Sequence, residues 1–298
     1  MKILITGGSG FVGTALSRHF LEKGAEVSAT GTSAAHSLSD RENFTYIQAD
    51  TTRQGEWQDA LQQVDLVINL AGRNIFKRWT RSYKKQIYDS RILTTRNLVS
   101  AFPERKEIVF FSASAAGYYG NRGDEILTED TTSGKGFLST VCVDWEKEAF
   151  KAKEKGIRVI AARLGVVLGK DGGALEKMIP AFRFFVGGPL GDGKHWFPWI
   201  HIDDLFSAIL FLLEKPEIDG PVNFCSPGSI RYEEFAGALG SALKRPSFFK
   251  TPAFVIKTIM GELGEALLDS QRSVPEKLRA SGFQFQFPEI QSALSSIL

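Results

Sequence analysis

The segment at residues 6–13, TGGSGFVG, limits the possible folds of this chain more than any other feature. It directly follows an apolar run, Lys2–Thr6, and leads into residues 11–23, where Leu16, Phe20 and Leu21 recur at helical spacing. Glycine has no side chain, so it permits a tight turn and a close approach of other backbone. The sequence therefore predicts a strand that turns sharply into a helix, the first unit of an α/β fold.

The segments up to about residue 164 repeat this alternation. Further strands are expected at residues 26–30, 44–49, 64–70, 107–113 and 158–164, and helices at residues 56–63, 82–101 and 137–155. Strands such as LVINLA are apolar throughout, which is typical of parallel strands covered on both faces. We predict that residues 1–165 form a Rossmann-type, doubly wound parallel sheet of the α/β class.

The pattern changes after residue 165. Residues 187–199, GGPLGDGKHWFPW, have the composition of a loop, whereas residues 203–214 predict a helix and residues 221–225 a short strand. The alternation in FQFQF, residues 283–287, predicts a half-buried strand. We expect residues 166–298 to form a smaller C-terminal α+β substrate domain, with residues 203–225 packed back on the first sheet.

The composition excludes several classes of protein. The 298 residues include 36 Lys and Arg against 34 Asp and Glu, so no overall field attracts nucleic acid or anionic lipid. Only two cysteines occur, Cys142 and Cys225, which suits a reducing compartment. The most apolar stretch, residues 205–213, is shorter than the roughly 20 residues that a membrane-spanning helix needs. We expect a cytoplasmic monomer or homodimer that binds neither nucleic acid nor a membrane.

The glycine segment also has the spacing of a dinucleotide-binding turn. Gly7 would form the tight turn, Gly10 would admit a pyrophosphate, and Gly13 would let the helix lie close to the strand. The start of the helix would present free N–H groups to the phosphates. The alternative is a glycine-rich turn that binds nothing. The predicted cofactor-binding residues here are Gly7, Ser9, Gly10, Phe11, Val12 and Gly13.

The end of the second strand favours NADP(H) over NAD(H). An NAD site usually places an Asp or Glu there to bind the ribose 2′-hydroxyl. Residues 29–33 read ATGTS and contain no acid. Thr32, Ser33 and the amides near Gly31 can instead bind a 2′-phosphate, although no arginine lies in this segment.

Two other predicted strands end in small or polar residues. Leu70, Ala71 and Gly72 follow the fourth strand, and small residues at this edge would admit adenine and ribose, although a tight strand exit explains them equally well. In SASAAGYYG, residues 112–120, hydroxyls and phenols leave the sheet where a nicotinamide would lie. We predict Ser114 and Tyr118 as catalytic and Tyr119 as a substrate contact.

Several motifs together resemble a known family. The motifs are TGGSGFVG, NLAG, KRWT…SRILTTRNL, SASAAGYYG, RLGVVLGKDGGAL, GGPLGDGKHWFPWIHIDDL and GPVNFCSP. With these motifs the chain is similar to an atypical branch of the extended short-chain dehydrogenase/reductases, whose members are described as nucleoside-diphosphate-sugar epimerase-like and sometimes as cell-division inhibitors. Residues 245–293 resemble the small C-terminal domain of unknown function in that branch.

One departure from this family concerns its catalytic residues. The wider superfamily uses a Tyr-x-x-x-Lys pair on the helix after the fifth strand, in which the Tyr is the acid/base and the Lys lowers its pKa. Leu138 and Cys142 stand at those positions, and neither can transfer the proton. Arg91 replaces an Asn of the superfamily and offers a fixed charge for a phosphate or carboxylate, with an ion pair to Asp89 as the alternative. We assign Arg91 to the cofactor site.

Other residues are candidates for contacts with the substrate. Lys135 precedes the altered helix, and His195 and Trp196 lie in the glycine-rich loop, so we predict that all three contact substrate. His201 and Asp204 resemble a His-x-x-Asp element that usually links the two domains of extended members. The four histidines show no metal-ligand spacing, so no metal is expected.

These features predict an NADP(H)-binding oxidoreductase or epimerase that acts on a small polar molecule such as a nucleotide sugar. The missing Tyr and Lys keep a second hypothesis open, a non-catalytic regulatory protein that binds NADP(H).

Overall fold

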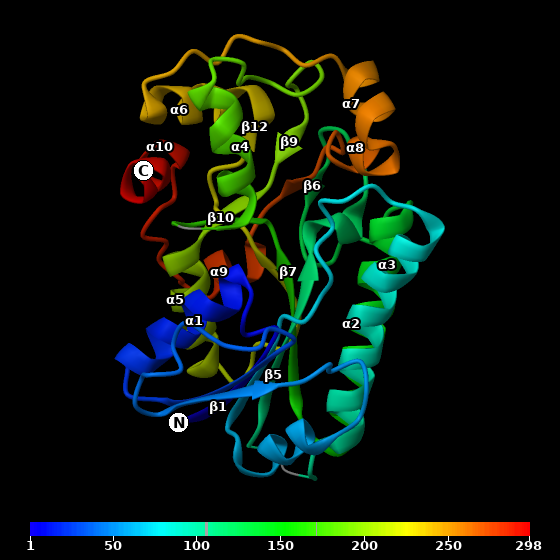
Figure 1. The fold of residues 1–298 in the computed structure, drawn as a ribbon, viewed down its shortest axis with the longest axis vertical. Helices are drawn as coiled ribbons and strands as arrows, with labels where there is room; N and C mark the ends of the chain where they lie inside the picture. Colours follow the sequence, from blue (N-terminus) through cyan, green and yellow to red (C-terminus); the bar gives the residue numbers. More distant parts are fainter. Residues whose placement is uncertain (105–106, 171) are drawn as a thin grey trace.

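A seven-stranded parallel sheet forms the centre of the protein (Figure 1). The computed structural model describes residues 1–104, 107–170 and 172–298, so Asp171 of the RLGVVLGKDGGAL motif lies outside the described residues. The strand order is β11-β7-β5-β4-β1-β2-β3, which confirms the predicted fold class. The strands are β1 (Lys2–Thr6), β2 (Glu26–Gly31), β3 (Phe44–Gln48), β4 (Leu66–Asn69), β5 (Val109–Ala115), β7 (Arg158–Leu164) and β11 (Gly220–Phe224).

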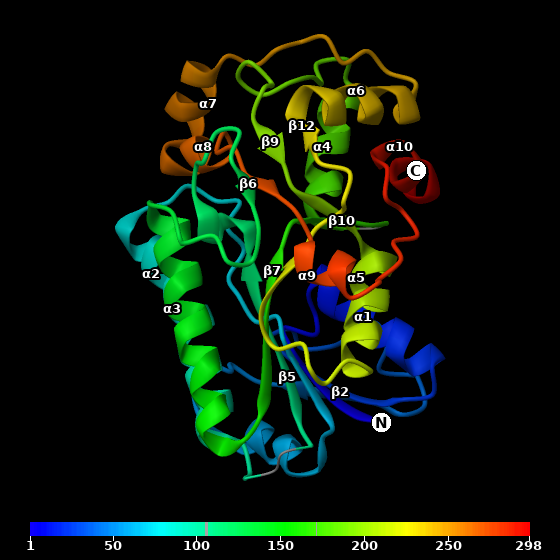
Figure 2. The ribbon, with the colours of Figure 1, turned by 180° about the vertical axis from the view of Figure 1, so that it is seen from behind.

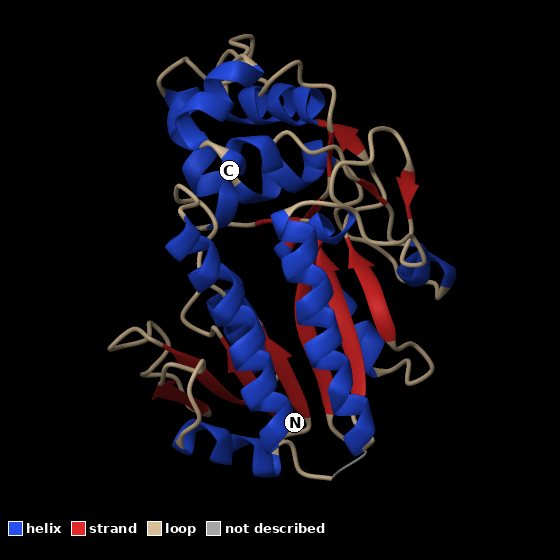
Figure 3. Cartoon of the chain, turned by 90° about the vertical axis from the view of Figure 1, so that its right-hand side faces the viewer, coloured by secondary structure: helices blue, strands red, loops and turns tan. Residues whose placement is uncertain are grey.

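Helices cover both faces of this sheet (Figure 3). Ile3 and Ile5 pack with residues of α1 (Phe11–Glu22) and α5 (Ile202–Leu213). Leu4 points to the opposite face, because side chains alternate along a strand, and belongs to a second core cluster. The elements over that face are η1 (Glu56–Gln63), α2 (Arg81–Ala101), α3 (Phe137–Phe150) and η3 (Lys151–Lys155).

The strand order reverses beside β1. The chain runs from β1 outward to β2 and β3, then returns to β4 on the other side of β1. Thr6, the last residue of β1, therefore pairs with Thr30 of β2 and with Asn69 of β4. In open α/β sheets, ligands bind at the carboxyl ends of the strands where the order reverses. The glycine turn begins at this point.

The chain after β7 builds a second region and also returns to the sheet. α5 contacts α1, and β11 pairs in parallel with β7. The boundary between residues 165 and 166 stays a prediction. A separate core joins α4, α6 and α10. The remaining elements are η2 (Ala116–Tyr119), β6 (Ile126–Leu127), β8 (Val166–Leu168), α4 (Gly173–Arg183), β9 (Trp196–Phe197), β10 (Trp199–His201), β12 (Ile230–Arg231), α6 (Tyr232–Leu243), α7 (Ala253–Met260), α8 (Glu262–Ala266), β13 (Arg272–Ser273), α9 (Glu276–Ala280) and α10 (Ile290–Ile297).

The strand predicted at residues 283–287 does not form. The segment pairs with no strand, and its backbone amides instead bind a buried carboxylate. Asp204 of α5 accepts N–H bonds from Gln286 at 2.7 Å and Phe287 at 3.0 Å. The side chain of Asp204 therefore takes the place that a neighbouring strand would fill and ties α5 to the C-terminal segment.

Candidate functional site

The glycine turn has the geometry that the sequence predicts. Gly7 has a φ of +70°, and a Cβ there would lie 2.8 Å from the carbonyl carbon of Leu70. A Cβ on Gly13 would lie 2.5 Å from the Gly7 oxygen, so only glycine lets α1 approach the turn this closely. Gly10 is different, because its φ is −79° and a Cβ there would meet only the Gly7 oxygen at 3.2 Å. A side chain on Gly10 would therefore enter the space in front of the turn.

A histidine that sequence analysis did not assign supports this turn. The Nε2 of His36 lies 3.1 Å from the carbonyl oxygen of Gly8, and Thr14 donates to the same oxygen at 3.1 Å. The His36 ring is buried against Phe44 and Tyr46. His36 thus stabilises the turn from behind.

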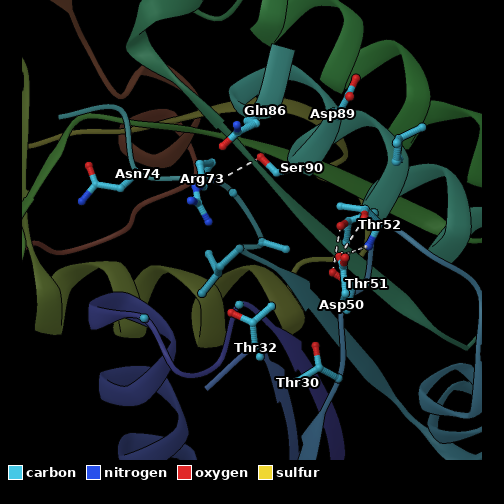
Figure 4. Close-up of a pocket in the computed structure, with 18 of the residues that line it drawn as sticks. Thr30, Thr32, Asp50, Thr51, Thr52, Arg73, Asn74, Gln86, Asp89 and Ser90 are labelled. Atoms are coloured by element: carbon cyan, nitrogen blue, oxygen red, sulfur yellow. Dashed lines mark hydrogen bonds between the residues drawn. The ribbon is translucent and has the colours of Figure 1, made fainter. Parts of the chain in front are cut away.

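A groove of about 760 Å³ opens beside the turn (Figure 4). Its walls come from the carboxyl ends of β1 to β4 and from α2. Of the predicted residues, the groove is lined by Gly7, Ser9, Gly10, Thr32, Leu70, Ala71 and Gly72. Ser33 and Val12 do not line it: Ser33 is exposed beside it, and Val12 packs against the hydrophobic core.

Several polar residues of this groove were missed in the sequence. Asp50 follows β3 and accepts hydrogen bonds from the backbone N–H and hydroxyl of Thr52. Arg73 follows β4, and its backbone N–H donates to Ser90 of α2 at 2.8 Å (Figure 4). Thr30 contributes a buried hydroxyl that has no hydrogen-bond partner among the described residues. Asp50 could have been predicted as a groove residue from the sequence, because it directly follows the strand predicted at residues 44–49, at the same edge of the sheet as the glycines.

A second groove, of about 730 Å³, continues from the first. The two share Ser9, Gly10, Gly72 and two residues of the following loop. Phe11, Gly72 and Arg91 line the second groove, and a Cβ on Gly172 would lie 2.4 Å from the Phe11 ring. Together the two grooves extend on both sides of the glycine turn, as an elongated ligand such as a dinucleotide requires.

Arg91 is a half-buried cation, and no acidic side chain pairs with it among the residues that the structure describes. Its guanidinium Nη1 donates to the backbone oxygens of Arg73 and Ile87, at 3.2 Å and 3.0 Å. The ion pair with Asp89 that the sequence left open does not form, since Asp89 pairs with Lys85. Burial lowers the pKa of Arg91. The guanidinium is next to Gly72, since a Cβ on Gly72 would lie 2.9 Å from the Arg91 Cζ. It places positive charge at the wall of the second groove.

Ser114 belongs to a buried polar network rather than to a pocket. It donates to Glu146 at 2.6 Å, and Arg163 donates two bonds of 2.9 Å to the same carboxylate. Only 2% of Ser114 is exposed, and it lines none of the described pockets. The predicted catalytic role of Ser114 finds no support in this geometry, because the hydroxyl is already committed to Glu146.

The two tyrosines of the same loop are also structural. Tyr119 is fully buried, and its hydroxyl contacts Thr128, Asn223 and Arg163 within 3.0 Å. The predicted contact of Tyr119 with substrate therefore finds no support in this geometry. The Tyr118 ring lies on the guanidinium of Arg163, with Cζ 3.5 Å from the ring centroid, and Tyr118 lines none of the described pockets. Its predicted catalytic role is likewise unsupported.

Leu138 and Cys142 occupy the start of α3. Leu138 lines a third pocket, of about 560 Å³, at the end of β5. Cys142 is buried, and burial together with the charge of Glu146 raises the pKa of its thiol to about 11. The thiol is therefore neutral at physiological pH and is no replacement for a lysine.

The third pocket is lined by residues of the first domain and by residues of the C-terminal segment. α8 lies above the start of α3 in both views (Figures 1 and 2), and its residues Glu262 and Glu265 line the pocket. Lys135 and Asp269 also line it, and neither side chain has a hydrogen-bond or ion-pair partner among the described residues. Burial, assisted by the charge of Glu265, raises the pKa of Asp269 to about 6.

His195 and Trp196 do not line this pocket, although the Trp196 backbone N–H donates to Ser270, next to Asp269. His195 is buried against the Tyr232 ring, and burial lowers its pKa. The Trp196 ring contacts the guanidinium groups of Arg231 and Arg272, and its N–H donates to Asp124. Neither residue lines the third pocket, and their ring contacts are to the protein, so their contact with substrate stays a prediction.

The described residues contain no group of three or more His, Cys, Asp or Glu side chains that could bind a metal. Within the same residues, no helix is both long and apolar enough to span a membrane.

The reversed strand order, the glycine turn and the grooves on both sides of it define a Rossmann-type, dinucleotide-binding protein. The chain belongs to the NAD dependent epimerase/dehydratase family, whose model matches residues 3–224. Residues 251–297 match a domain of unknown function, DUF1731, which confirms the resemblance seen in the sequence near residues 245–293.

Relatives match over the whole chain. The epimerase family protein SDR39U1 homolog of Arabidopsis thaliana chloroplasts is 38% identical and is covered over 87% of its length. The epimerase family protein YfhF of Bacillus subtilis is 35% identical and is covered over 98%. The human epimerase family protein SDR39U1, solved with NADPH, is 31% identical, with a TM-score of 0.87 and 99% of its chain covered. This protein is therefore an NAD(P)-binding member of the epimerase family.

A more distant structure shows how widely the fold is shared. UDP-glucuronic acid 4-epimerase from Bacillus cereus, in complex with NAD, is 17% identical and has a TM-score of 0.79 over 99% of this chain and 94% of its own. At this identity the likeness concerns the fold alone.

Proposed function

We propose that the protein is an NADP(H)-dependent oxidoreductase or epimerase that acts on a small polar molecule such as a nucleotide sugar. The observation that carries the cofactor proposal is the groove at the end of β2, which presents Thr32 and the unpartnered hydroxyl of Thr30 where an NAD site would have an acid. Arg73 and Lys77 line the same groove, together with the acids Asp50 and Asp89. The NADPH in the human relative supports this choice.

The residues present fit the cofactor. Gly10 leaves open the space that a pyrophosphate needs, and the free N–H groups at the start of α1 face it. Ser9 and Phe11 line the grooves at that point, and Arg91 contributes a charge to the second groove. Bound NADP(H) would supply or accept a hydride.

The third pocket is the proposed substrate site. It contains Lys135 for binding an anionic or polar group and Asp269 for holding a proton. A carboxyl group with a pKa of about 6 is protonated in a useful fraction of molecules near neutral pH. We propose that Asp269 is the acid/base of the reaction, in place of the phenol that Leu138 has replaced.

The alternative function is regulatory, with NADP(H) binding and no turnover. The observation that favours it is the loss of chemistry around α3, where Leu138 is apolar, the Cys142 thiol is neutral and Ser114 is bonded to Glu146. The unpartnered Lys135 and Asp269 favour catalysis instead, because a protein that only senses the cofactor needs no such groups. The proposal also includes a cytoplasmic monomer or homodimer with a small-molecule partner.

Calorimetric titration of nucleotide-free protein with NADPH, and separately with NADH, tests the cofactor. Tight binding of NADPH and weak binding of NADH is expected. Equal binding of both would contradict the argument from β2, and binding of neither would refute the cofactor site.

A substrate screen that follows nicotinamide absorbance tests catalysis. With any substrate found, Asp269→Asn should lower turnover at least a hundredfold, within the usual effect of losing a general acid. Leu138→Ala is the matched control from the same pocket, and its turnover should stay within about tenfold, or about 1.4 kcal/mol of barrier. Equal losses in both variants would remove Asp269 from the mechanism. A screen without turnover would favour the regulatory alternative.

A further inference from the structure

The end of α4 and the chain between α6 and α7 lie at the end of the molecule opposite the N-terminus (Figures 1 and 2), and both segments carry exposed phenyl rings. Phe184 is 77% exposed and Phe248 is 70% exposed, and exposed apolar residues follow each of them in the sequence. We define the basic aromatic patch as Phe184, Phe185, Val186, Phe248 and Phe249 with the exposed residues Arg183, Lys244, Arg245 and Lys250.

Backbone contacts hold the two segments of this patch together. A Cβ on Gly188 would lie 2.3 Å from the Phe249 oxygen, and the Thr251 N–H donates to Pro189 at 2.9 Å. The Arg245 guanidinium lies 4.9 Å from the centroid of the Phe185 ring. The two segments therefore lie side by side, although they come from distant parts of the sequence.

The fold does not need these rings where they are. Phe185 follows the end of α4 with a φ of 63°, a left-handed conformation that is unfavourable for a bulky residue and is usually occupied by glycine. Its side chain is 53% exposed, so little burial compensates for this conformation. A residue that is both strained and exposed suggests a contact outside the chain.

Charge is unevenly distributed around the patch. The segments 183–186 and 244–250 contain four of the 36 Lys and Arg residues and none of the 34 acids, so the rest of the chain has 32 basic and 34 acidic side chains. None of the four cations has an acidic partner among the described residues. The nearly neutral net charge of the chain, +2, therefore includes two adjacent segments that carry basic side chains and no acidic ones.

We propose that the basic aromatic patch is a docking surface for a lipid bilayer with anionic headgroups. Exposed phenyl rings beside Lys and Arg can enter the interface while the cations contact the headgroups. A second copy of the chain fits less well, because a two-fold contact would place each patch against itself and bring like charges together. The attachment lies on the surface of the membrane and requires no spanning helix.

Sedimentation of the full-length protein with lipid vesicles tests this proposal. Vesicles of phosphatidylcholine containing phosphatidylglycerol should bind the protein at low salt, and vesicles of phosphatidylcholine alone should bind it at least about tenfold more weakly. Phe184→Ser with Phe248→Ser, and separately Arg245→Glu with Lys250→Glu, should each reduce binding at least about tenfold. Ile126→Ser and Lys23→Glu, exposed and outside the patch, are the matched controls and should bind normally.

Phe185→Gly separates a docking role from a structural one. Glycine suits the left-handed conformation, so this variant should have a thermal midpoint at or above that of the wild type while it binds anionic vesicles more weakly. A lower midpoint with unchanged binding would overturn the proposal. So would an absence of vesicle binding by the wild type, or a self-association that Phe184→Ser with Phe248→Ser abolishes. NADPH titration checks that the cofactor groove of each variant is intact, so the outcome is independent of the proposed enzymatic function.

Discussion

Glu146 and Arg163 form an ion pair in the interior of the protein, with side chains that are only 6% and 3% exposed. The Nε and Nη2 of Arg163 each lie 2.9 Å from a carboxylate oxygen of Glu146. The pair joins α3 to β7 and also binds Ser114 of β5. It therefore fixes the position of the loop that follows β5.

Glu146→Leu should lower the free energy of unfolding by about 3–5 kcal/mol, because it leaves the Arg163 charge buried without a counterion. Urea unfolding measures this loss. Lys151→Met is the control, since Lys151 is an exposed partner of Glu148 on the same helix and its loss should cost at most about 1 kcal/mol. Glu146→Leu with Arg163→Leu should recover part of the stability. A loss below about 1 kcal/mol in the single variant would contradict a structural role for the pair.

Gly10→Glu should reduce the affinity for NADPH at least about a hundredfold and leave the fold intact, because its backbone is extended and its side chain would enter the groove. Gly13→Ala should instead lower the free energy of unfolding by about 1–3 kcal/mol, because its Cβ would lie 2.5 Å from the Gly7 oxygen. Calorimetric titration and urea unfolding of both variants measure the two effects. Normal NADPH binding by Gly10→Glu would place the cofactor elsewhere.

The groove could largely be predicted from the sequence because it depends on local signals. Gly7 and Gly13 sit between an apolar strand and a helix, and the same reasoning about strand ends extends to Asp50. The position of Thr32 in the groove follows from the parallel alternation of strands and helices.

The loop after β5 could not be predicted, because distant residues decide which of its side chains are exposed. The Tyr119 hydroxyl bonds to Asn223, which is 104 residues away, and to Arg163, which is 44 residues away. The prediction of a strand at residues 283–287 fails for a related reason. Its alternating pattern suits a strand, but Asp204 binds the amides that a neighbouring strand would have paired.

Neither cysteine should react with a thiol reagent in the native protein at pH 8. Cys142 and Cys225 are 4% and 1% exposed, and burial raises their pKa values to about 11 and about 12. A thiol that is both neutral and shielded is a poor nucleophile. Absorbance after addition of a disulfide reagent should report no reaction in buffer and two thiols per chain in concentrated urea. Rapid labelling of Cys142 in buffer would mean that α3 opens beside the proposed substrate pocket.

Asp269 should make the stability of the protein fall as the pH rises from about 4 to about 6. Its pKa is raised to about 6 in the folded chain, by burial first and by the charge of Glu265 second, whereas an unfolded chain has an Asp pKa of about 3.9. Between these values the folded state holds more protons than the unfolded state, so raising the pH favours unfolding, and the effect is complete above about pH 6. Asp269→Asn removes this titration, so its urea midpoint should match that of the wild type near pH 4 and exceed it at pH 7.5.

Asp40→Asn is the matched control for Asp269, because Asp40 is exposed and lines none of the described pockets. Its urea midpoint should differ from that of the wild type by the same small amount at every pH. A difference between Asp269→Asn and the wild type that does not change between pH 4 and pH 7.5 would show that the pKa of Asp269 is the same in the folded and unfolded chains, at about 3.9. Asp269 would then carry no proton near neutral pH, and its proposed role as the acid/base of the third pocket would fail with it.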